Sequence, residues 1–240
     1  MGEVKLPINV QKKEIVIPGE LLADGKYLAG ANTIREGNAI YATKVGLANI
    51  EGNRIMVVPL AGCYIPAIGD QVIGRVIDIG LSGWQADIDA PYPAMLPASE
   101  AINHRQEHLK QDLAKILDVG DLIIAKILAF DRTRDPLLTI RSQGLGRITS
   151  GRVIKISPAK VPRLIGRKGS MINMIKKETG CQVIVGQNGR ILVSSRSPIR
   201  EQIAIAAIYK IEREAHIEGL TDRVREMIRR MIRDASVHPE

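Results

Sequence analysis

The chain has 240 residues, of which 45% are apolar and 3% are aromatic, and its formal net charge at pH 7 is +8. This length allows two or three small domains whose cores are mainly aliphatic. No apolar run approaches the roughly 18 residues of a membrane-spanning helix, no signal-peptide pattern opens the chain, and Cys63 and Cys181 form no CxxC pair. We therefore expect a soluble, cytoplasmic protein without a zinc ribbon.

Residues 1–64 are predicted to form a small β domain. Strands are expected at 15–20, 39–43 and 54–60, where β-branched and apolar residues are bounded by glycine-containing turns. The segment is nearly neutral, with seven cations and six anions, and it contains no catalytic constellation. We interpret it as a domain that contacts other proteins.

Residues 65–145 are predicted to form a barrel of the OB type. The segment alternates short apolar strands with glycine-containing turns. Five strands with a helical insertion before the fourth is the plan of an OB barrel. The strands are expected at 72–79, 83–88, 122–130 and 137–141, with 92–100 as a short irregular crossing and a helix over 101–117.

Several features of this segment resemble the S1-type OB domain of RNA-binding proteins. They are the strand openings Gly69-Asp70 and Gly120-Asp121, the Leu96-Pro97-Ala98-Ser99 crossing, and the basic loop that begins at Asp131. The resemblance implies contact with RNA. Four cations are candidates for an electrostatic RNA path along this barrel: Lys126, Arg132, Arg134 and Arg141.

One departure from the S1 pattern concerns aromatic residues. In that family the second strand usually presents two Phe side chains to RNA, and the crossing often carries a His. The corresponding positions here are Ser82, Gln85 and Pro97, and Trp84 falls between them with an ambiguous facing. Base stacking contributes roughly 1–3 kcal/mol per base, so we expect the barrel to bind RNA weakly on its own. Direct RNA contact and a spacer or pore-lining role both stay open.

The letters His104-Arg105-Gln106-Glu107-His108 match the H-x-x-E-H signature of inverted zinc peptidases. On a helix, His104 and His108 would share a face and could hold a metal ion. However, the predicted helix is a short polar insertion in a small barrel, and no third ligand is indicated. An exposed polar helix explains the same letters, so we expect neither a metal nor another cofactor.

Residues 146–240 are predicted to follow the order β-α-(Gly-x-x-Gly)-α-β-β-α, and the Gly-x-x-Gly loop is Gly166-Arg167-Lys168-Gly169. This order and this loop resemble the KH domain in its type I arrangement. Asn188-Gly189 is a hairpin signal. The strands are expected at 151–157, 181–186 and 190–194, and the helices at 159–165, 170–179 and 197–215.

The Gly-x-x-Gly loop is the main candidate for a phosphate contact. Its glycines allow a close approach of the backbone, and Arg167 and Lys168 add positive charge. The loop lies within residues 136–177, which contain ten Lys and Arg and no Asp or Glu. This block favours a polyanion as the partner, although a simple helix-to-helix turn and contact with an acidic protein are the alternatives.

A KH groove clamps about four nucleotides above an apolar floor. The resemblance to KH domains therefore nominates neighbours of the loop as further RNA contacts, while Lys176 and Lys177 could be ordinary surface charge. The nominated cations are Lys160 and Arg163, and the nominated floor residues are Leu164, Ile165, Ile172 and Ile175.

The C-terminal segment 221–234 is predicted to be an amphipathic helix, because apolar residues recur at helical spacing from Val224 to Ile232 and arginines fill much of the other face. It could pack on the KH domain, or it could dock on a partner subunit or RNA.

The order of β domain (1–64), S1 barrel (65–145) and KH domain (146–240) resembles one family as a whole, the exosome RNA-binding cap subunits of the ribosomal-RNA-processing-protein-four type, in an archaeal form. Val16-Ile17-Pro18-Gly19 with Ala23-Asp24-Gly25, and Val57-Val58-Pro59-Leu60 leading to Gly69-Asp70, resemble its N-terminal signature. The expected fold is therefore multidomain α+β.

The family resemblance implies a non-catalytic subunit. Three copies would cap a hexameric ring of phosphorolytic ribonuclease subunits, possibly mixed with a zinc-ribbon cap protein, and would guide the 3′ ends of single-stranded RNA into the ring for degradation or processing. The alternative is a freestanding S1/KH protein that regulates translation or transcription.

Overall fold

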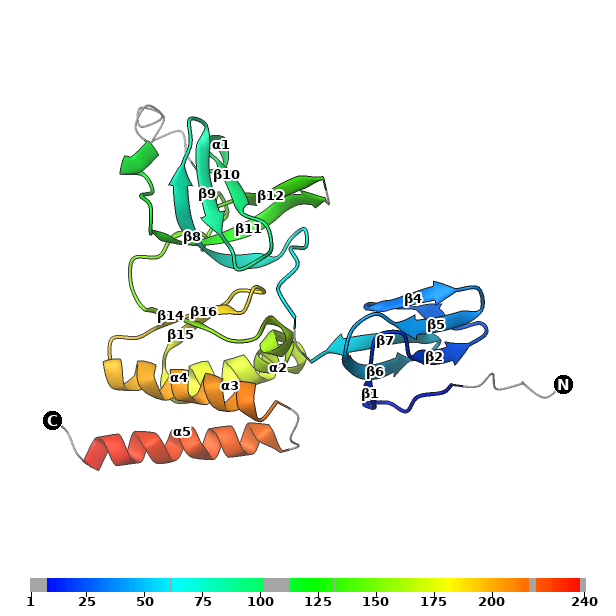
Figure 1. The fold of residues 1–240 in the computed structure, drawn as a ribbon. Coiled ribbons are helices and arrows are strands. Elements are labelled where there is room, and N and C mark those ends of the chain that lie inside the picture. Colours follow the sequence, from blue (N-terminus) through cyan, green and yellow to red (C-terminus); the bar gives the residue numbers. More distant parts are fainter. Residues whose placement is uncertain (1–7, 61, 102–112, 132, 216–218, 238–240) are drawn as a thin grey trace. The chain divides into compact units, whose positions relative to one another are not determined.

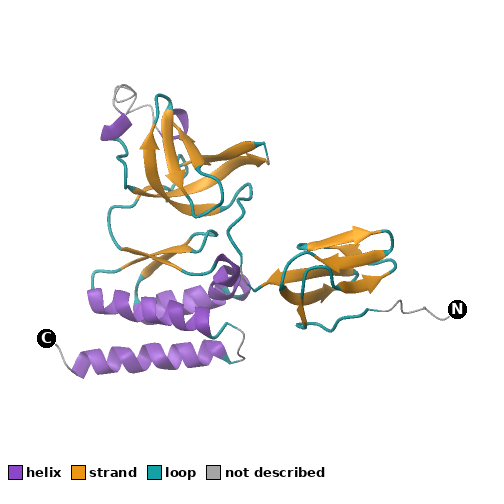
Figure 2. Cartoon of the chain, in the orientation of Figure 1, coloured by secondary structure: helices purple, strands orange, loops and turns teal. Residues whose placement is uncertain are grey.

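The computed structural model describes residues 8–60, 62–101, 113–131, 133–215 and 219–237 (Figures 1 and 2). The chain forms two compact units, Met1–Gly62 and Cys63–Glu240. Strands make up the first unit, and the second combines strands and helices. No helix among the described residues is long and apolar enough to cross a membrane.

The first unit is built from two small sheets around an aliphatic core. One sheet has the order β1-β6-β7-β3 and the other β2-β5-β4. Buried side chains such as Val16, Leu22, Ile40 and Ile55 hold the two sheets together. The strands are β1 (Ile15–Val16), β2 (Leu21–Asp24), β3 (Leu28–Ala29), β4 (Thr33–Glu36), β5 (Ala39–Ala42), β6 (Gly46–Glu51) and β7 (Arg54–Pro59).

The second unit begins with a closed five-stranded barrel, so the predicted OB plan is confirmed. Antiparallel pairs join β8 to β9 and β11, β9 to β10, and β11 to β12, and a parallel pair between β10 and β12 closes the barrel. A short strand β13 (Gly146–Arg147) extends β11. The barrel strands are β8 (Gln71–Ile79), β9 (Gly83–Asp87), β10 (Ala94–Pro97), β11 (Leu122–Asp131) and β12 (Arg134–Thr139).

The segment predicted as an irregular crossing contains a regular strand, β10, followed by the short helix α1 (Ala98–Ala101). Because the segment contains prolines, its sequence did not indicate a strand, but pairing with β9 stabilises one. Gly83 permits that pairing, because a Cβ at this position would lie 2.2 Å from the carbonyl oxygen of Leu96. Of the predicted helix at 101–117, residues 102–112 lie outside the described part, and Leu113–Lys115 form a 3₁₀ turn.

The single tryptophan belongs to the barrel core. Trp84 is fully buried, and its Nε1 donates a hydrogen bond to the carbonyl oxygen of Leu117 at 2.9 Å. The indole therefore fills the barrel and has no face free for a ligand.

The KH part places three helices on one face of a three-stranded sheet, and a fourth helix outside them (Figure 1). The strand order is β14-β16-β15. This arrangement follows the predicted β-α-α-β-β-α order. The elements are β14 (Arg152–Lys155), α2 (Val161–Ile165), α3 (Ser170–Thr179), β15 (Gln182–Val185), β16 (Arg190–Ser194), α4 (Pro198–Arg213) and α5 (Leu220–Val237).

Helix α5 packs on the KH part, which was the first of its three predicted alternatives. Leu220, Val224 and Ile228 are buried in the same core as the helices α2 to α4. Arg229 adds a two-pronged ion pair with Glu178 of α3, at 2.8 and 3.0 Å. The apolar face of α5 is thus packed against the KH core of this chain.

The barrel and the KH sheet form one unit through a polar contact around Asn188, which is fully buried. Its Nδ2 donates to the carbonyl oxygens of Ile73 and Ile88, both at 2.8 Å, and its Oδ1 accepts from the N–H of Ile73 at 3.3 Å. The predicted hairpin turn at Asn188-Gly189 is therefore also a joint between the two folds.

Further contacts flank this joint. Arg190 pairs with Asp87, and Lys155 with Asp89 at 2.7 Å. Burial alone would raise the pKa of Asp87, but hydrogen bonds from Arg190 and from the N–H of Asp89 hold that pKa below its ordinary value. An apolar cluster fills the rest of the contact and consists of Ile73, Ile124, Leu145, Ile148, Val153, Ile184 and Leu192.

Candidate nucleic-acid interface

The loop between α2 and α3 has a backbone that its sequence explains. Gly166 and Gly169 have φ angles of +74° and +78°, a region that side chains disfavour. A Cβ on Gly166 would also lie 2.9 Å from the backbone nitrogen of Met171. Lys168 has a φ of +52° without being glycine. Such left-handed non-glycine residues cost energy and are frequent in loops that bind ligands.

The two cations of the loop are unpaired within the described part of the chain. Arg167 and Lys168 are exposed, and neither forms an ion pair or hydrogen bond with a described residue. Nearby, Arg163 is exposed on α2, and Lys160 is half-buried where α2 begins. The structure thus brings the predicted cations of this region onto one short segment, α2 to α3.

The predicted apolar floor is smaller than the sequence suggested. Leu164 and Ile175 are fully buried, so they belong to the core. Ile172 is 8% exposed and also belongs to that core, whereas Ile165 is half-buried and packs against it. A base above this loop would therefore meet mainly Ile165 and the edge of Ile172.

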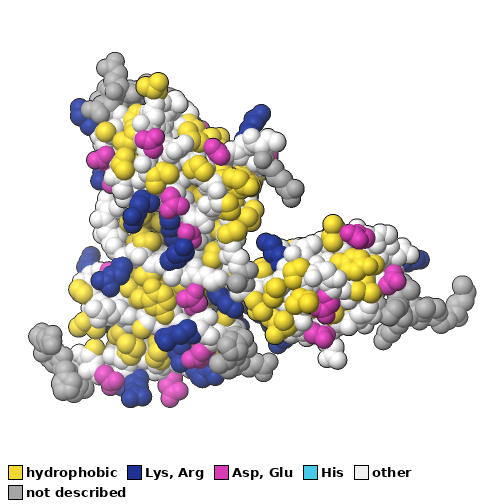
Figure 3. All heavy atoms as spheres, in the orientation of Figure 1, with side chains coloured by type: hydrophobic (Ala, Val, Ile, Leu, Met, Phe, Trp, Pro, Cys, Tyr) yellow, Lys and Arg dark blue, Asp and Glu magenta, His cyan; other side chains and the backbone are white. Residues whose placement is uncertain are grey.

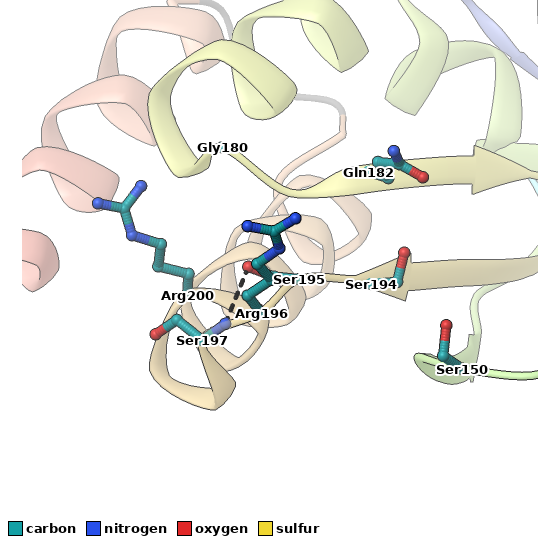
Figure 4. A pocket seen from close by; sticks show the side chains of 8 residues that line it. All are labelled: Ser150, Gly180, Gln182, Ser194, Ser195, Arg196, Ser197 and Arg200. Carbon is teal, nitrogen blue, oxygen red and sulfur yellow. Dashed lines mark hydrogen bonds between the residues drawn. The ribbon is translucent and has the colours of Figure 1, made fainter.

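A polar hollow of about 550 Å³ lies at the opposite end of α3 (Figure 4). Because α3 has ten residues, the two ends are about 15 Å apart. Arg196 pairs with no described residue, while Nη1 of Arg200 donates to the carbonyl oxygen of Thr179 at 3.3 Å. The hollow has no carboxylate in its lining, which consists of Ser150, Gly180, Gln182, Ser194, Ser195, Arg196, Ser197 and Arg200.

The three predicted barrel cations that the structure describes do not lie together in one patch. Lys126 is exposed on β11, and Arg134 begins β12 opposite Asp131, so about 16 Å of strand separates them. Arg141 follows β12 and lies 4.0 Å from Glu100. Arg132 lies outside the described residues.

The barrel positions that carry aromatic rings in S1 domains are poor stacking surfaces here. Ser82 is exposed, and Gln85 and Pro97 are half-buried. Sequence reasoning missed another aromatic pair, Tyr92 and Phe130, whose ring centroids are 5.9 Å apart at an interplanar angle of 45°. The position of Phe130 directly before the Asp-Arg loop was the only available signal.

A metal centre finds no support in the described part of the chain, where no group of three or more His, Cys, Asp and Glu side chains is placed to hold an ion. The motif from His104 to His108 lies outside the described residues.

An S1-type barrel joined to a type I KH domain with a basic Gly-x-x-Gly loop defines a class of RNA-binding proteins. Three family models match this chain: the exosome RNA binding protein RRP4 N-terminal domain at residues 13–61, the RRP4 S1 domain at 63–129, and the KH domain at 151–199. The chain belongs to the Rrp4 family of exosome components, which is not a catalytic family.

Relatives in two archaea support this membership along the whole chain. The exosome complex component Rrp4 of Thermococcus kodakarensis is 48% identical over 95% of this chain and 89% of its own length. The protein of the same name from Thermofilum pendens is 45% identical over 94% of this chain and 97% of its own length. A crystal structure of an exosome complex RNA-binding protein, 42% identical, aligns with a TM-score of 0.65 over 72% of this chain and 99% of its own.

Proposed function

We propose that this chain is the RNA-binding cap subunit of an exosome, which binds single-stranded RNA and guides its 3′ end to a phosphorolytic ribonuclease ring. The Gly166–Gly169 loop is the observation that carries the RNA-binding part. It combines two glycines with positive φ angles and two exposed cations that pair with no described residue, inside a block of sequence without acids. The family relationship favours this function over that of a freestanding regulator.

The loop suits the phosphodiester backbone more than the bases. Backbone N–H groups at the start of α3 and the side chains of Arg167 and Lys168 offer donors and positive charge to phosphate oxygens. Lys160 and Arg163 extend the positive charge along α2, and Ile165 offers a small apolar surface. Binding should therefore depend strongly on salt and weakly on sequence.

The polar hollow at the far end of α3 suits a further phosphate of the same strand. Guanidinium groups bind phosphates in two-pronged geometry, and serine hydroxyls add donors. The barrel cations Lys126, Arg132, Arg134 and Arg141 are separate, weaker contacts in this proposal, and each would act mainly through long-range charge.

The first unit is proposed to dock on the ring. It exposes several large apolar side chains, among them Ile15 and Ile17 at 64% and 60% exposure. Figure 3 shows hydrophobic side chains gathered on the face of this unit that is in view. Patches of this kind mark protein interfaces. From the family resemblance we propose three copies on a hexameric ring, with places shared with a zinc-ribbon cap protein, in the cytoplasm.

The docking proposal is tested by size-exclusion chromatography of the chain with purified ring subunits. The unaltered chain should co-migrate with the ring, and Ile17→Asp should abolish co-migration, because it places a charge in the apolar interface. Val119→Asp is the matched control, since Val119 is 56% exposed in the second unit. Failure of the unaltered chain to co-migrate would refute the cap assignment.

A further inference from the structure

A second hollow, of about 640 Å³, lies on the barrel where β11 ends and β12 begins. Its wall is apolar and includes Tyr92, Met95, Phe130 and Leu137, and its rim is polar and includes Asp131 and Arg134. The chain has only seven Phe, Tyr and Trp residues, and two of them, Tyr92 and Phe130, line this hollow. Tyr92 is 45% exposed, so part of its ring is open to solvent.

Strand register connects this hollow to the usual stacking surface of S1 domains. Gln85 on β9 is directly opposite Met95 on β10, and Met95 is directly opposite Leu137 on β12. Residues opposite each other point to the same side of a sheet. The row from Gln85 therefore leads outward across two strands, about 10 Å, to the hollow.

The rim offers polar partners at fixed positions. The hydroxyl and N–H groups of Thr133 donate to Asp131, at 2.6 and 2.8 Å, and hold the pKa of that carboxyl below its ordinary value. An ionised carboxylate accepts hydrogen bonds from the amino groups of bases. The guanidinium of Arg134 can stack on a base or contact its phosphate.

We propose that this hollow binds one unpaired nucleobase of the RNA, stacked against Tyr92 and held at its edge by Asp131. A base is the ligand that combines a flat apolar face with an edge of donors, which matches an aromatic wall beside a carboxylate. The proposal rests on the RNA-binding function above and supplies the barrel with a stacking site that Ser82, Gln85 and Pro97 do not provide.

The test is a cycle of substitutions in protein and RNA. The full chain is titrated with a single-stranded RNA of about a dozen nucleotides and with versions that carry one abasic nucleotide at successive positions. Tyr92→Ala should weaken binding of the intact RNA by about 5- to 150-fold, the range for loss of one stacked base. Tyr92→Phe is the matched control, and it should bind as the unaltered chain does, because it keeps the ring.

The cycle and its salt dependence distinguish stacking from other roles. One abasic position should weaken binding to the unaltered chain and have no further effect on Tyr92→Ala. The slope of log affinity against log salt should be unchanged by Tyr92→Ala, since no phosphate contact is lost.

Unchanged affinity of Tyr92→Ala for intact RNA would overturn the proposal. If Tyr92→Ala lost co-migration with the ring and kept its RNA affinity, the hollow would be a protein contact instead. When charge reversal at Arg167 and Lys168 weakens binding but Tyr92→Ala does not, the hollow alone is refuted. When the unaltered chain binds no single-stranded RNA, the proposed function and this inference fail together.

Discussion

The Gly166–Gly169 loop and the Tyr92–Phe130 hollow offer RNA two different kinds of contact. The loop presents backbone donors at the start of α3 and two cations that pair with no residue in the described part of the chain, with little apolar surface. The hollow presents aromatic rings, one guanidinium and carboxylates. The difference indicates a division of labour in which the KH part holds the phosphodiester backbone and the barrel holds a base. Contacts of the first kind are weakened by salt, and those of the second are not.

The largest expected effect concerns the loop. Replacing both Arg167 and Lys168 by Asp should lower the affinity for single-stranded RNA about 100-fold at low salt, because it removes two charge-assisted contacts and adds repulsion. The salt slope should fall by about 1.4, or about 0.7 for each lost phosphate contact on a single strand.

The matched control for this change is the pair Arg213→Asp and Arg233→Asp, which changes the net charge equally at exposed positions of α4 and α5, outside both proposed phosphate contacts. Equal loss of affinity in the two double variants would reduce the role of the loop to general charge.

The next effect concerns the joint between the two regions. Asn188→Ala removes the side-chain partner of the Ile88 carbonyl oxygen and of the Ile73 N–H, while the Ile73 carbonyl oxygen keeps only Nη1 of Arg190, at 3.3 Å. An unsatisfied buried polar group costs roughly 1–3 kcal/mol. We expect a loss of about 2–4 kcal/mol in the free energy of unfolding, measured in urea. Asn173→Ala, at an exposed position on α3, should change stability by less than about 0.5 kcal/mol. Equal losses in the free energy of unfolding for the two variants would show that the joint does not stabilise the fold.

A smaller effect concerns the polar hollow of Figure 4. Arg196→Glu with Arg200→Glu should weaken binding of an RNA of about a dozen nucleotides by about fivefold and leave a tetranucleotide on the Gly-x-x-Gly loop unaffected. Arg213→Glu with Arg233→Glu supplies the same charge change at exposed positions outside the hollow. Equal losses for short and long RNA would remove the hollow from the RNA path.

The smallest effect is a dependence of the joint on pH. The pKa of Asp87 is lowered in the folded chain, so its pairing with Arg190 stabilises the fold fully above the unfolded pKa of about 3.9. This contribution is lost as pH falls through the lower, folded pKa. Because the carboxylate is partly exposed, the change should stay below about 1 kcal/mol. Asp87→Asn should remove it from the pH dependence of unfolding, and an unchanged profile would assign the effect to other carboxyls.

Elements with strong local signals were predictable from sequence. Helix α3 has the predicted bounds, because glycines stop it on both sides: Gly169 and Gly180 have positive φ angles. The sequence did not predict β10, whose prolines look irregular and whose regularity comes from pairing with β9. The facing of Trp84 was also left open, although β9 alternates regularly, with Trp84 and Ala86 buried and Gln85 half-buried. Alternation within the strand would therefore have predicted an inward indole.

The parts of the candidate site that escaped prediction depend on residues distant in sequence. Tyr92 and Phe130 form a pair only after the barrel closes. Asn188 is part of an ordinary hairpin signal, but its role in joining the KH sheet to the barrel depends on Ile73 and Ile88, which belong to the barrel. Local patterns carry no information on such partners. Local patterns did predict the Gly-x-x-Gly loop, because its glycines and cations lie within four consecutive residues.

The joint at Asn188 also makes the two RNA contacts arms of one bivalent binder. Because buried hydrogen bonds and an apolar cluster join the barrel to the KH sheet, the base hollow and the phosphate loop keep a set separation. Once an RNA strand is bound at one contact, its free part is held near the other contact at a high effective concentration, which is typically in the millimolar range for short flexible connections. The affinity for RNA should accordingly rise steeply once the RNA is long enough to reach both contacts. The joint thereby sets the minimum RNA length for tight binding.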